Sequence, residues 1–252
     1  MTQETINTLV KTSSELPKAE ELIKAGVHFG HRTTKWNPKM KPYIFGAKNN
    51  VHIIDLDKTI EALKRAIDFL KEAASKGNVI LLVGTIPAAK NIIKDAALAC
   101  QMPYVNERWL GGTLTNFKII SKRLEHFRDL GKKREDGELK KYTKKEQLDF
   151  DEELKKLERK FGGIKNLTKI PEALLVLDPK KNDLAVKEAI RVKIPVIALC
   201  DTNINPTSID FPIPANDDAS SSLALIASYL VRAINDGKKI SISSEKPVAK
   251  KS

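Results

Sequence analysis

Three short runs of this chain contain no polar side chain. They read VILLV at 79–83, ALLVL at 173–177 and PVIAL at 195–199. A strand with one solvent-facing side alternates apolar and polar residues, whereas a continuous apolar run predicts a strand that is covered on both faces. Strands of that kind are typical of a parallel sheet packed between two layers of helices.

Helix-forming stretches at 87–99, 182–192 and 219–235 alternate with these runs, and two shorter strands are expected at 103–105 and 211–213. Parallel strands need a crossover connection, and such connections are right-handed. The alternation therefore predicts an α/β fold, a doubly wound parallel sheet with helices on both faces.

The N-terminal part has a different pattern. A short helix is expected at 18–25, ended by Gly26, and a longer one at about 57–75. Between them, YIFG (43–46) and VHII (51–54) predict two strands joined by a hairpin-type connection.

Residues 113–167 interrupt the alternation of strands and helices. Apolar residues recur there at spacings of three and four, which is the period of an amphipathic helix. The first stripe contains Leu114, Phe117, Ile120, Leu124, Phe127 and Leu130, and the second contains Phe150, Leu154, Leu157, Phe161 and Ile164. Two such helices separated by a polar linker predict an inserted antiparallel coiled-coil helical hairpin.

This hairpin has an excess of positive charge, since residues 113–170 carry 17 basic and 11 acidic side chains. The cations expected near its tip are Lys132, Lys133, Arg134, Lys140, Lys141, Lys144 and Lys145. Two interpretations remain open, an ordinary solvated coiled coil and an arm that binds a polyanion. The charge excess favours the arm.

We accordingly expect four parts in the chain. Residues 1–17 are an N-terminal extension, and 18–112 together with 168–236 form the α/β core. Residues 113–167 form the coiled-coil hairpin insertion, and 237–252 are a basic flexible tail.

The segment from His31 to Asn50 contains five basic residues and no acidic one. The cations are Arg32, Lys35, Lys39, Lys41 and Lys48, with Trp36, Tyr43 and Phe45 among them. Two prolines and a glycine disfavour a long helix, so the segment is expected to be extended or looped. It suits a nucleic acid, because cations neutralise phosphates and flat rings stack on unpaired bases. The alternative is a solvated surface loop whose rings pack inward.

The formal net charge of the whole chain is +12, which favours polyanionic partners. No apolar run is long enough to span a bilayer, and the N-terminus lacks the pattern of a secretory signal. We therefore expect a cytoplasmic protein without a membrane partner. In that compartment Cys100 and Cys200 are expected to be buried thiols rather than a disulfide.

A doubly wound sheet raises the question of a nucleotide site. The first strand ends in VGTIPAAK, which matches neither GxGxxG nor GxxxxGK[ST]. Backbone N–H groups beside Gly111 and Gly112 could hold a phosphate, or the glycines could simply form a tight turn. Asp178 and Asp201 follow two predicted strands, where active sites of such folds gather, but turn residues after each explain them as well. A nucleotide- or phosphate-binding α/β enzyme is therefore the rival hypothesis.

His28 and His31 are separated by two residues, which raises the question of a metal. A zinc site normally has about four ligands, and the chain contains no CxxC or HExxH motif. Local packing or hydrogen bonding is expected for both imidazoles. We predict no metal site, no other cofactor and no catalytic residue.

Several longer segments together resemble the ribosomal protein S2 family of the bacterial-type small subunit. They are AEELIKAGVHFGH (19–31), KWNPKMKPYIFGAKNNVHIIDLDKT (35–59), NERWLGGTLTNF (106–117), PEALLVLDPKKNDLAVKEAIRVKIPVIALCDTN (171–203) and PIPANDDA (212–219). They occur in the family's order and cover most of residues 19–235. The chain departs from the family at its ends, where the start looks longer than usual and the lysine-rich tail is family-variable.

The resemblance implies a flavodoxin-like sheet with a protruding helical hairpin. It also implies a non-catalytic role in translation, as a constituent of the small ribosomal subunit. The implied partners are small-subunit ribosomal RNA and neighbouring ribosomal proteins, including ribosomal protein S1 where a bacterium has it. No small-molecule substrate is implied.

The charge pattern predicts which residues contact RNA. In the N-terminal segment they are Arg32, Lys35, Lys39, Lys41 and Lys48, with Trp36 and Tyr43 either stacking on bases or bracing the loop. In the arm they are Lys118, Lys122, Arg123, Lys132, Lys133 and Arg134. Arg108, beside the glycine pair, could serve RNA or the core. A third hypothesis is a free cytoplasmic scaffold that binds proteins through the coiled coil.

Overall fold

Five parallel strands form the centre of the structure, a computed structural model that describes residues 16–244. They are β4 (Ile80–Val83), β5 (Tyr104–Val105), β6 (Ala173–Val176), β7 (Val196–Cys200) and β8 (Phe211–Pro214). Their order is β5-β4-β6-β7-β8, and each neighbouring pair is parallel. Every residue of β4, β6 and β7 is buried, which confirms the prediction of strands covered on both faces. Most of the expected N-terminal extension and the end of the expected tail lie outside the described residues.

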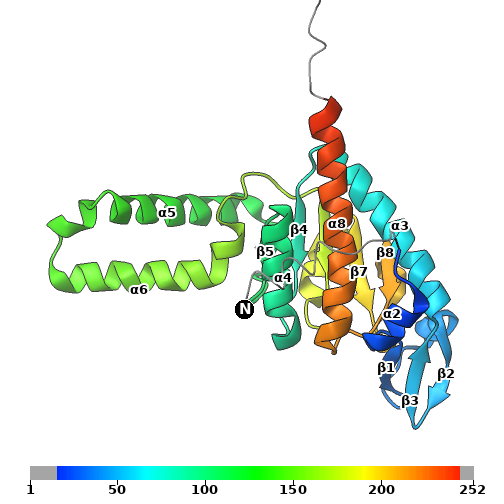
Figure 1. The fold of residues 1–252 in the computed structure, drawn as a ribbon. Helices are drawn as coiled ribbons and strands as arrows, with labels where there is room; N and C mark the ends of the chain where they lie inside the picture. The colour runs from blue at the N-terminus through cyan, green and yellow to red at the C-terminus, as the bar shows by residue number, and fades with distance from the viewer. Residues whose placement is uncertain (1–15, 245–252) are drawn as a thin grey trace, which may run out of the picture.

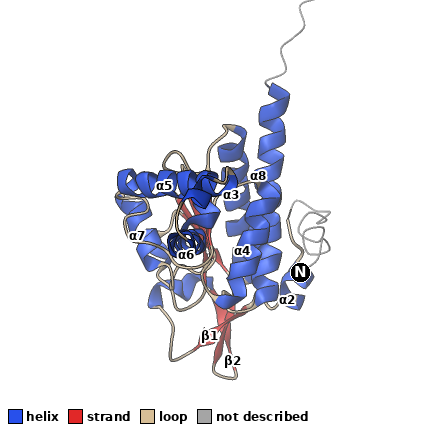
Figure 2. Cartoon of the chain, turned by 90° about the vertical axis from the view of Figure 1, so that its left-hand side faces the viewer, coloured by secondary structure: helices blue, strands red, loops and turns tan. Residues whose placement is uncertain are grey.

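Helices lie on both sides of this sheet (Figure 1, Figure 2). The core helices are α3 (Leu56–Ser75), α4 (Pro87–Cys100), α7 (Asp183–Arg191) and α8 (Ser220–Ser244). In β4, Ile80 and Leu82 belong to the apolar cluster that includes α3, α4 and α8, whereas Leu81 and Val83 belong to the cluster that includes α7. Successive side chains of a strand point to opposite faces, so one short strand supplies both clusters. The α/β class is thereby confirmed.

Helix α8 is longer than the sequence pattern predicts. It reaches Ser244 and includes the first residues of the stretch expected to be a flexible tail. The Lys238 ammonium group donates a hydrogen bond to the Cys100 carbonyl oxygen at 2.6 Å, which ties this extension to α4. A Cβ atom at Gly237 would stand 2.3 Å from the Lys71 carbonyl oxygen, so glycine is required where α8 crosses α3. None of the helices within the described residues is long and apolar enough to cross a bilayer.

Both cysteines are buried free thiols, as predicted. Cys100 ends α4 and Cys200 ends β7. Burial raises the pKa of the Cys100 thiol to about 11 and that of the Cys200 thiol further, so neither is a thiolate at neutral pH. They act as small apolar side chains of the core.

A second, antiparallel sheet follows the short helix α2 (Ala19–Lys24). Its strands are β1 (Phe29–Arg32), β3 (Val51–Ile54) and β2 (Ile44–Lys48), in that order across the sheet. The turn between β2 and β3 is Asn49–Asn50, with φ of 51° and 61°, and such two-residue turns match the twist of a hairpin. The predicted hairpin is therefore present, whereas β1 is a strand that the sequence pattern does not indicate.

The inserted segment forms two long helices that project from the core (Figure 1). They are α5 (Phe117–Glu135) and α6 (Lys144–Phe161), joined through a short 3₁₀ helix (Glu138–Lys141). The buried members of the two predicted apolar stripes are Leu114, Ile120, Leu124, Phe127, Leu130, Leu154, Phe161 and Ile164. We refer to residues 117–161 as the arm.

Candidate nucleic-acid interface

The basic segment is attached to the carboxyl edge of the parallel sheet. We define the basic unit as residues 29–54, which comprise β1, the loop after it, β2 and β3. The loop is fixed by Asn37, whose N–H donates to the Thr202 carbonyl oxygen at 2.8 Å, and by Met40, which is fully buried in the core. Strand β1 is fixed by His31, whose N–H donates to the Thr202 hydroxyl oxygen at 2.9 Å. The basic unit is thus an ordered part of the surface.

All five cations predicted for this unit are exposed, namely Arg32, Lys35, Lys39, Lys41 and Lys48. None of them forms an ion pair with another residue in the described part of the chain. Arg32 and Lys48 both lie opposite Val51 of the middle strand, so they flank the same end of the small sheet. A group of cations without acidic neighbours produces a positive potential that attracts a polyanion.

The three rings of the unit differ in exposure. Trp36 is 37% exposed, and its ring centre lies 5.2 Å from that of His52, so one part of the indole is covered. Tyr43 is half-buried and packs against the core, which makes it a brace of the loop rather than a free stacking surface. Phe45 in β2 is 81% exposed, although it is not among the predicted contacts. The ring that is most available for stacking is therefore Phe45.

The cations predicted for the arm are also exposed, namely Lys118, Lys122, Arg123, Lys132, Lys133 and Arg134. Their surroundings are more mixed than those of the basic unit. Arg134 Nε lies 3.1 Å from an Asp151 carboxylate oxygen of α6, and Lys156 Nζ lies 3.3 Å from Glu152. Acidic side chains therefore neutralise part of the positive charge of the arm.

Arg108 is exposed at the junction of the core and the arm. It lines a hollow together with four other cations, which are Lys90, Lys156, Arg159 and Lys160. Glu107 is the acidic residue of this hollow, and it accepts a hydrogen bond from Lys90 Nζ at 2.7 Å. The α6 cations are not among the predicted contacts, because only the fold brings the end of that helix beside Arg108.

The glycine pair before the arm surrounds a carboxylate of the chain itself. Glu188 of α7 accepts hydrogen bonds from the Trp109 indole N–H at 3.1 Å, the Gly112 N–H at 2.8 Å and the Leu114 N–H at 3.0 Å. It also accepts from the N–H and hydroxyl of Thr115. Burial would raise the pKa of Glu188, but these hydrogen bonds outweigh burial and the pKa is lowered. The donors that a phosphate would use are occupied, and Gly112, at φ +88°, serves the turn.

Asp178 occupies a similar position at the next loop. Its carboxylate accepts hydrogen bonds from the Ile86 N–H at 2.9 Å and the Thr85 N–H at 3.3 Å, at the start of α4, and from the Asn182 amide. Burial raises the pKa of this carboxyl to about 6, against the effect of those donors. The turn interpretation of Asp178 is thus the one that its contacts support.

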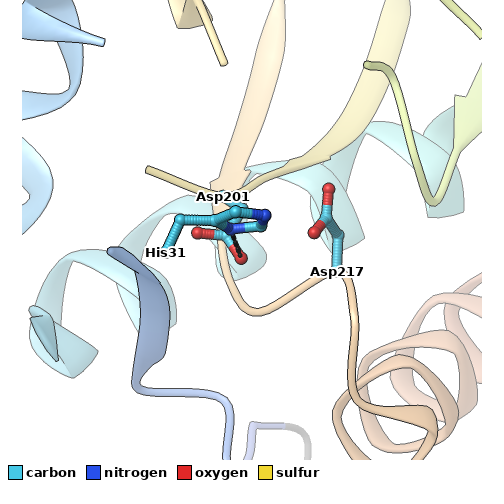
Figure 3. Close-up of side chains that lie close together, drawn as sticks. All are labelled: His31, Asp201 and Asp217. Atoms are coloured by element: carbon cyan, nitrogen blue, oxygen red, sulfur yellow. Dashed lines mark ion pairs between the residues drawn. The ribbon is translucent and has the colours of Figure 1, made fainter. Parts of the chain in front are cut away.

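His31 meets aspartates at the same edge of the sheet (Figure 3). Its Nδ1 lies 3.0 Å from Asp201 Oδ2, and its Nε2 lies 3.5 Å from Asp218 Oδ2. One ligand atom each of His31, Asp201 and Asp217 lie within 4.8 Å of one another. The hydrogen bond to Asp201 raises the pKa of His31, and burial, reinforced by Asp201 and Asp218, raises the pKa of Asp217 to about 7. The chemistry of His31 therefore depends on residues remote in sequence.

His28 lies apart from this cluster. Its ring centre is 4.1 Å from that of Phe29, and burial lowers its pKa. Both environments that the sequence suggests for these imidazoles therefore occur, local packing at His28 and hydrogen bonding at His31, although the partner of His31 is remote in sequence.

Comparisons with known proteins agree on one family. The sequence profile described as Ribosomal protein S2 matches residues 22–237. A protein named small ribosomal subunit protein uS2, from Geotalea uraniireducens, is 47% identical over 218 residues, which are 86% of this chain and 85% of the relative. A protein of the same name from Roseiflexus castenholzii is 46% identical over 241 residues, which are 96% of this chain and 92% of the relative. Because the matched region spans the parallel sheet, the basic unit and the arm, this chain belongs to the ribosomal protein S2 family.

Proposed function

We propose that this protein is a structural, non-catalytic constituent of the small ribosomal subunit, where it binds small-subunit ribosomal RNA through the basic unit and the arm. Both relatives are named as proteins of that subunit. The observation that carries the proposal is the basic unit, which has five exposed cations, no acidic residue between positions 31 and 50, and a backbone fixed to the core.

The physical basis is neutralisation of phosphates. Each cation that contacts a phosphate releases counterions from the RNA, which favours binding at low salt. Because Asn37 and Met40 already hold the loop in place, its backbone loses little conformational freedom when RNA binds. Phe45 supplies an exposed ring for an unpaired base.

The same geometry weakens the hypothesis of a nucleotide-binding enzyme. A phosphate in a doubly wound fold binds to backbone N–H groups at a helix start or a glycine-rich turn. Here the N–H groups of Thr85 and Ile86 are bonded to Asp178, and those of Gly112 and Leu114 are bonded to Glu188. A nucleotide would have to displace two buried carboxylates.

The fold and partners can be specified further in the same proposal. The order β5-β4-β6-β7-β8 corresponds to the 2-1-3-4-5 order of flavodoxin-like sheets, and the paired helices of the arm support a coiled coil. Ile119 and Leu148 on the arm are 50% and 61% exposed. Such apolar side chains fit contacts with neighbouring ribosomal proteins, among which the family resemblance implies ribosomal protein S1.

The test is incorporation of a tagged chain into small subunits in competition with the untagged protein. We expect a Lys35→Ala, Lys39→Ala, Lys41→Ala variant to be lost from the subunit peak of a sucrose gradient, first at the higher of two salt concentrations. The matched control is Lys64→Ala, Lys180→Ala, Lys181→Ala, which removes the same charge from exposed positions outside the basic unit. Equal incorporation of the two triple variants would contradict the proposal.

A further inference from the structure

Three side chains from separate parts of the chain meet between the basic unit and the parallel sheet (Figure 3). His31 belongs to β1, Asp201 directly follows β7, and Asp217 lies in the connection between β8 and α8. Asp201 is 1% exposed and Asp217 is 6% exposed. Two largely buried aspartates thus lie next to a single imidazole.

The protein balances the charges at this place only in part. Asp201 uses Oδ1 to accept hydrogen bonds from the N–H and hydroxyl of Thr202, while its Oδ2 faces His31. The carboxylate of Asp217 has no hydrogen bond or ion pair with any residue between positions 16 and 244. A carboxylate that is 6% exposed and has no protein partner retains little hydration, and a cation beside it would compensate its charge.

We infer that His31, Asp201 and Asp217 together bind one divalent transition-metal cation, with Zn²⁺ as the representative ion. An imidazole nitrogen combined with carboxylate oxygens is a ligand set that zinc accepts, whereas Mg²⁺ and Ca²⁺ prefer oxygen ligands alone. Asp218 Oδ2 lies 3.5 Å from His31 Nε2, the other ring nitrogen, where it can accept a hydrogen bond from the N–H of a metal-bound imidazole and orient the ring.

The distances are compatible with such an ion. With metal–ligand bonds of about 2.0–2.1 Å and tetrahedral geometry, neighbouring ligand atoms stand about 3.3 Å apart. His31 Nδ1 and Asp201 Oδ2 are already 3.0 Å apart, and an Asp217 oxygen lies within 4.8 Å of one ligand atom of each of these two residues. A movement of about 1–2 Å by Asp217, which is in a loop, completes this geometry. The imidazole binds in its neutral form, so the proton that it shares with Asp201 is released to solvent.

The consequence is structural. A metal ion here joins β1 to the end of β7 and to the start of α8, and it therefore fastens the basic unit to the core through three elements. This inference does not rest on the proposed function, because metal binding is measured on the purified chain without RNA.

The first test is metal binding by the purified full-length chain after treatment with a chelator. In competition with a chromophoric chelator, we expect one equivalent of Zn²⁺, which an excess of Mg²⁺ does not displace. Removing one ligand by Asp217→Asn or His31→Gln should weaken binding by at least about tenfold. The matched control is His28→Gln, which removes an imidazole three positions away and should leave the affinity unchanged. No bound zinc in the wild type, or equal affinity in Asp217→Asn, would overturn the inference.

The second test gives a new signal rather than a loss, so it does not depend on a weakened variant. In Asp217→Cys, bound Co²⁺ should show a thiolate-to-cobalt charge-transfer band in the near ultraviolet, because a thiolate then coordinates the ion. The wild type, which retains Cys200 nearby, and a His28→Cys variant should not show this band. Far-UV circular dichroism establishes that each variant is folded. A folded Asp217→Cys variant without the band would contradict coordination at position 217.

Discussion

The basic unit and the arm both present cations to solvent, but they are attached to the core in different ways. The basic unit lies directly on the sheet, with Met40 buried and Asn37 and His31 bonded to Thr202. The arm projects away from the sheet and is joined to it at one end, where Glu188 holds the loop that leads into α5 (Figure 1).

The two regions also differ in charge pattern. The segment from His31 to Asn50 contains no acidic residue, whereas residues 113–170 carry 11 acidic and 17 basic side chains. Ion pairs such as Arg134 with Asp151 neutralise part of the charge of the arm. We therefore expect the basic unit to supply most of the salt-dependent affinity for RNA, and the arm to supply a smaller share of it together with contacts to neighbouring proteins.

The largest effect should come from breaking the attachment of the arm. Glu188→Ala leaves the Trp109 indole and the N–H groups of Gly112 and Leu114 without their acceptor. Each buried donor costs about 1–3 kcal/mol, so unfolding in urea should show a loss of about 4 kcal/mol. Asp183→Ala, which removes an exposed carboxylate from the same helix, should cost less than about 1 kcal/mol. Similar losses in both variants would show that Glu188 does not hold the base of the arm.

The next effect tests the attachment of the basic unit. Met40→Ala removes a fully buried side chain under the loop and should lower the free energy of unfolding by about 3 kcal/mol. Incorporation into small subunits should fall although no charge changes, because the cations are then less well positioned. Incorporation at the wild-type level, together with the expected loss of stability, would mean that loop order does not matter for binding.

Substitution of Phe45 should weaken RNA binding without changing the stability of the fold. Because its ring is 81% exposed, Phe45→Ala should change the free energy of unfolding by less than about 0.5 kcal/mol. If a base stacks on this ring, affinity for ribosomal RNA should fall by about 1–3 kcal/mol. Leu148→Ala, an exposed apolar residue of the arm, is the control and should leave RNA affinity unchanged. If Phe45→Ala binds RNA with the affinity of the wild type, no base stacks on this ring.

The smallest effect is a dependence on pH at the base of the arm. The pKa of Glu188 is lowered in the folded state from an ordinary value of 4.5. The stability that its charge provides is therefore present above that ordinary value and is lost as the pH falls through the lowered folded value. In urea unfolding, the advantage of the wild type over Glu188→Gln should shrink as the pH is lowered below the ordinary value of 4.5. A constant difference between the two proteins would show that the charge of Glu188 is not involved.

The sequence predicts the parallel sheet well, because strands covered on both faces are apolar at every position, as in Ile80–Val83. It does not indicate β1, whose four residues include a glycine and a histidine and alternate in no clear way. It also places the end of α8 too early. The residues after Gly237 are mostly polar, and their helix is held by contacts with α3 and α4 that are not visible in a linear pattern.

Some of the candidate sites can also be predicted from a local sequence pattern, whereas others are assembled only by the fold. A run of cations without acids, such as Arg32 to Lys48, is local, so the pattern alone predicts an exposed basic surface. The buried role of Glu188 cannot be predicted from the sequence, because a single acidic residue on an amphipathic helix is ordinarily solvated. The cluster of His31, Asp201 and Asp217 cannot be predicted either, since its members come from opposite ends of the chain and meet only after the sheet forms.

The most direct measurement of the central claim is the slope of log affinity against log salt concentration for small-subunit ribosomal RNA. For Lys35→Ala, Lys39→Ala, Lys41→Ala, we predict a slope smaller by about 2–3 than that of the wild type. The equivalent arm variant, Lys118→Ala, Lys122→Ala, Arg123→Ala, should change the slope by less than about 1. Equal slopes for the wild type and the basic-unit variant would contradict the account.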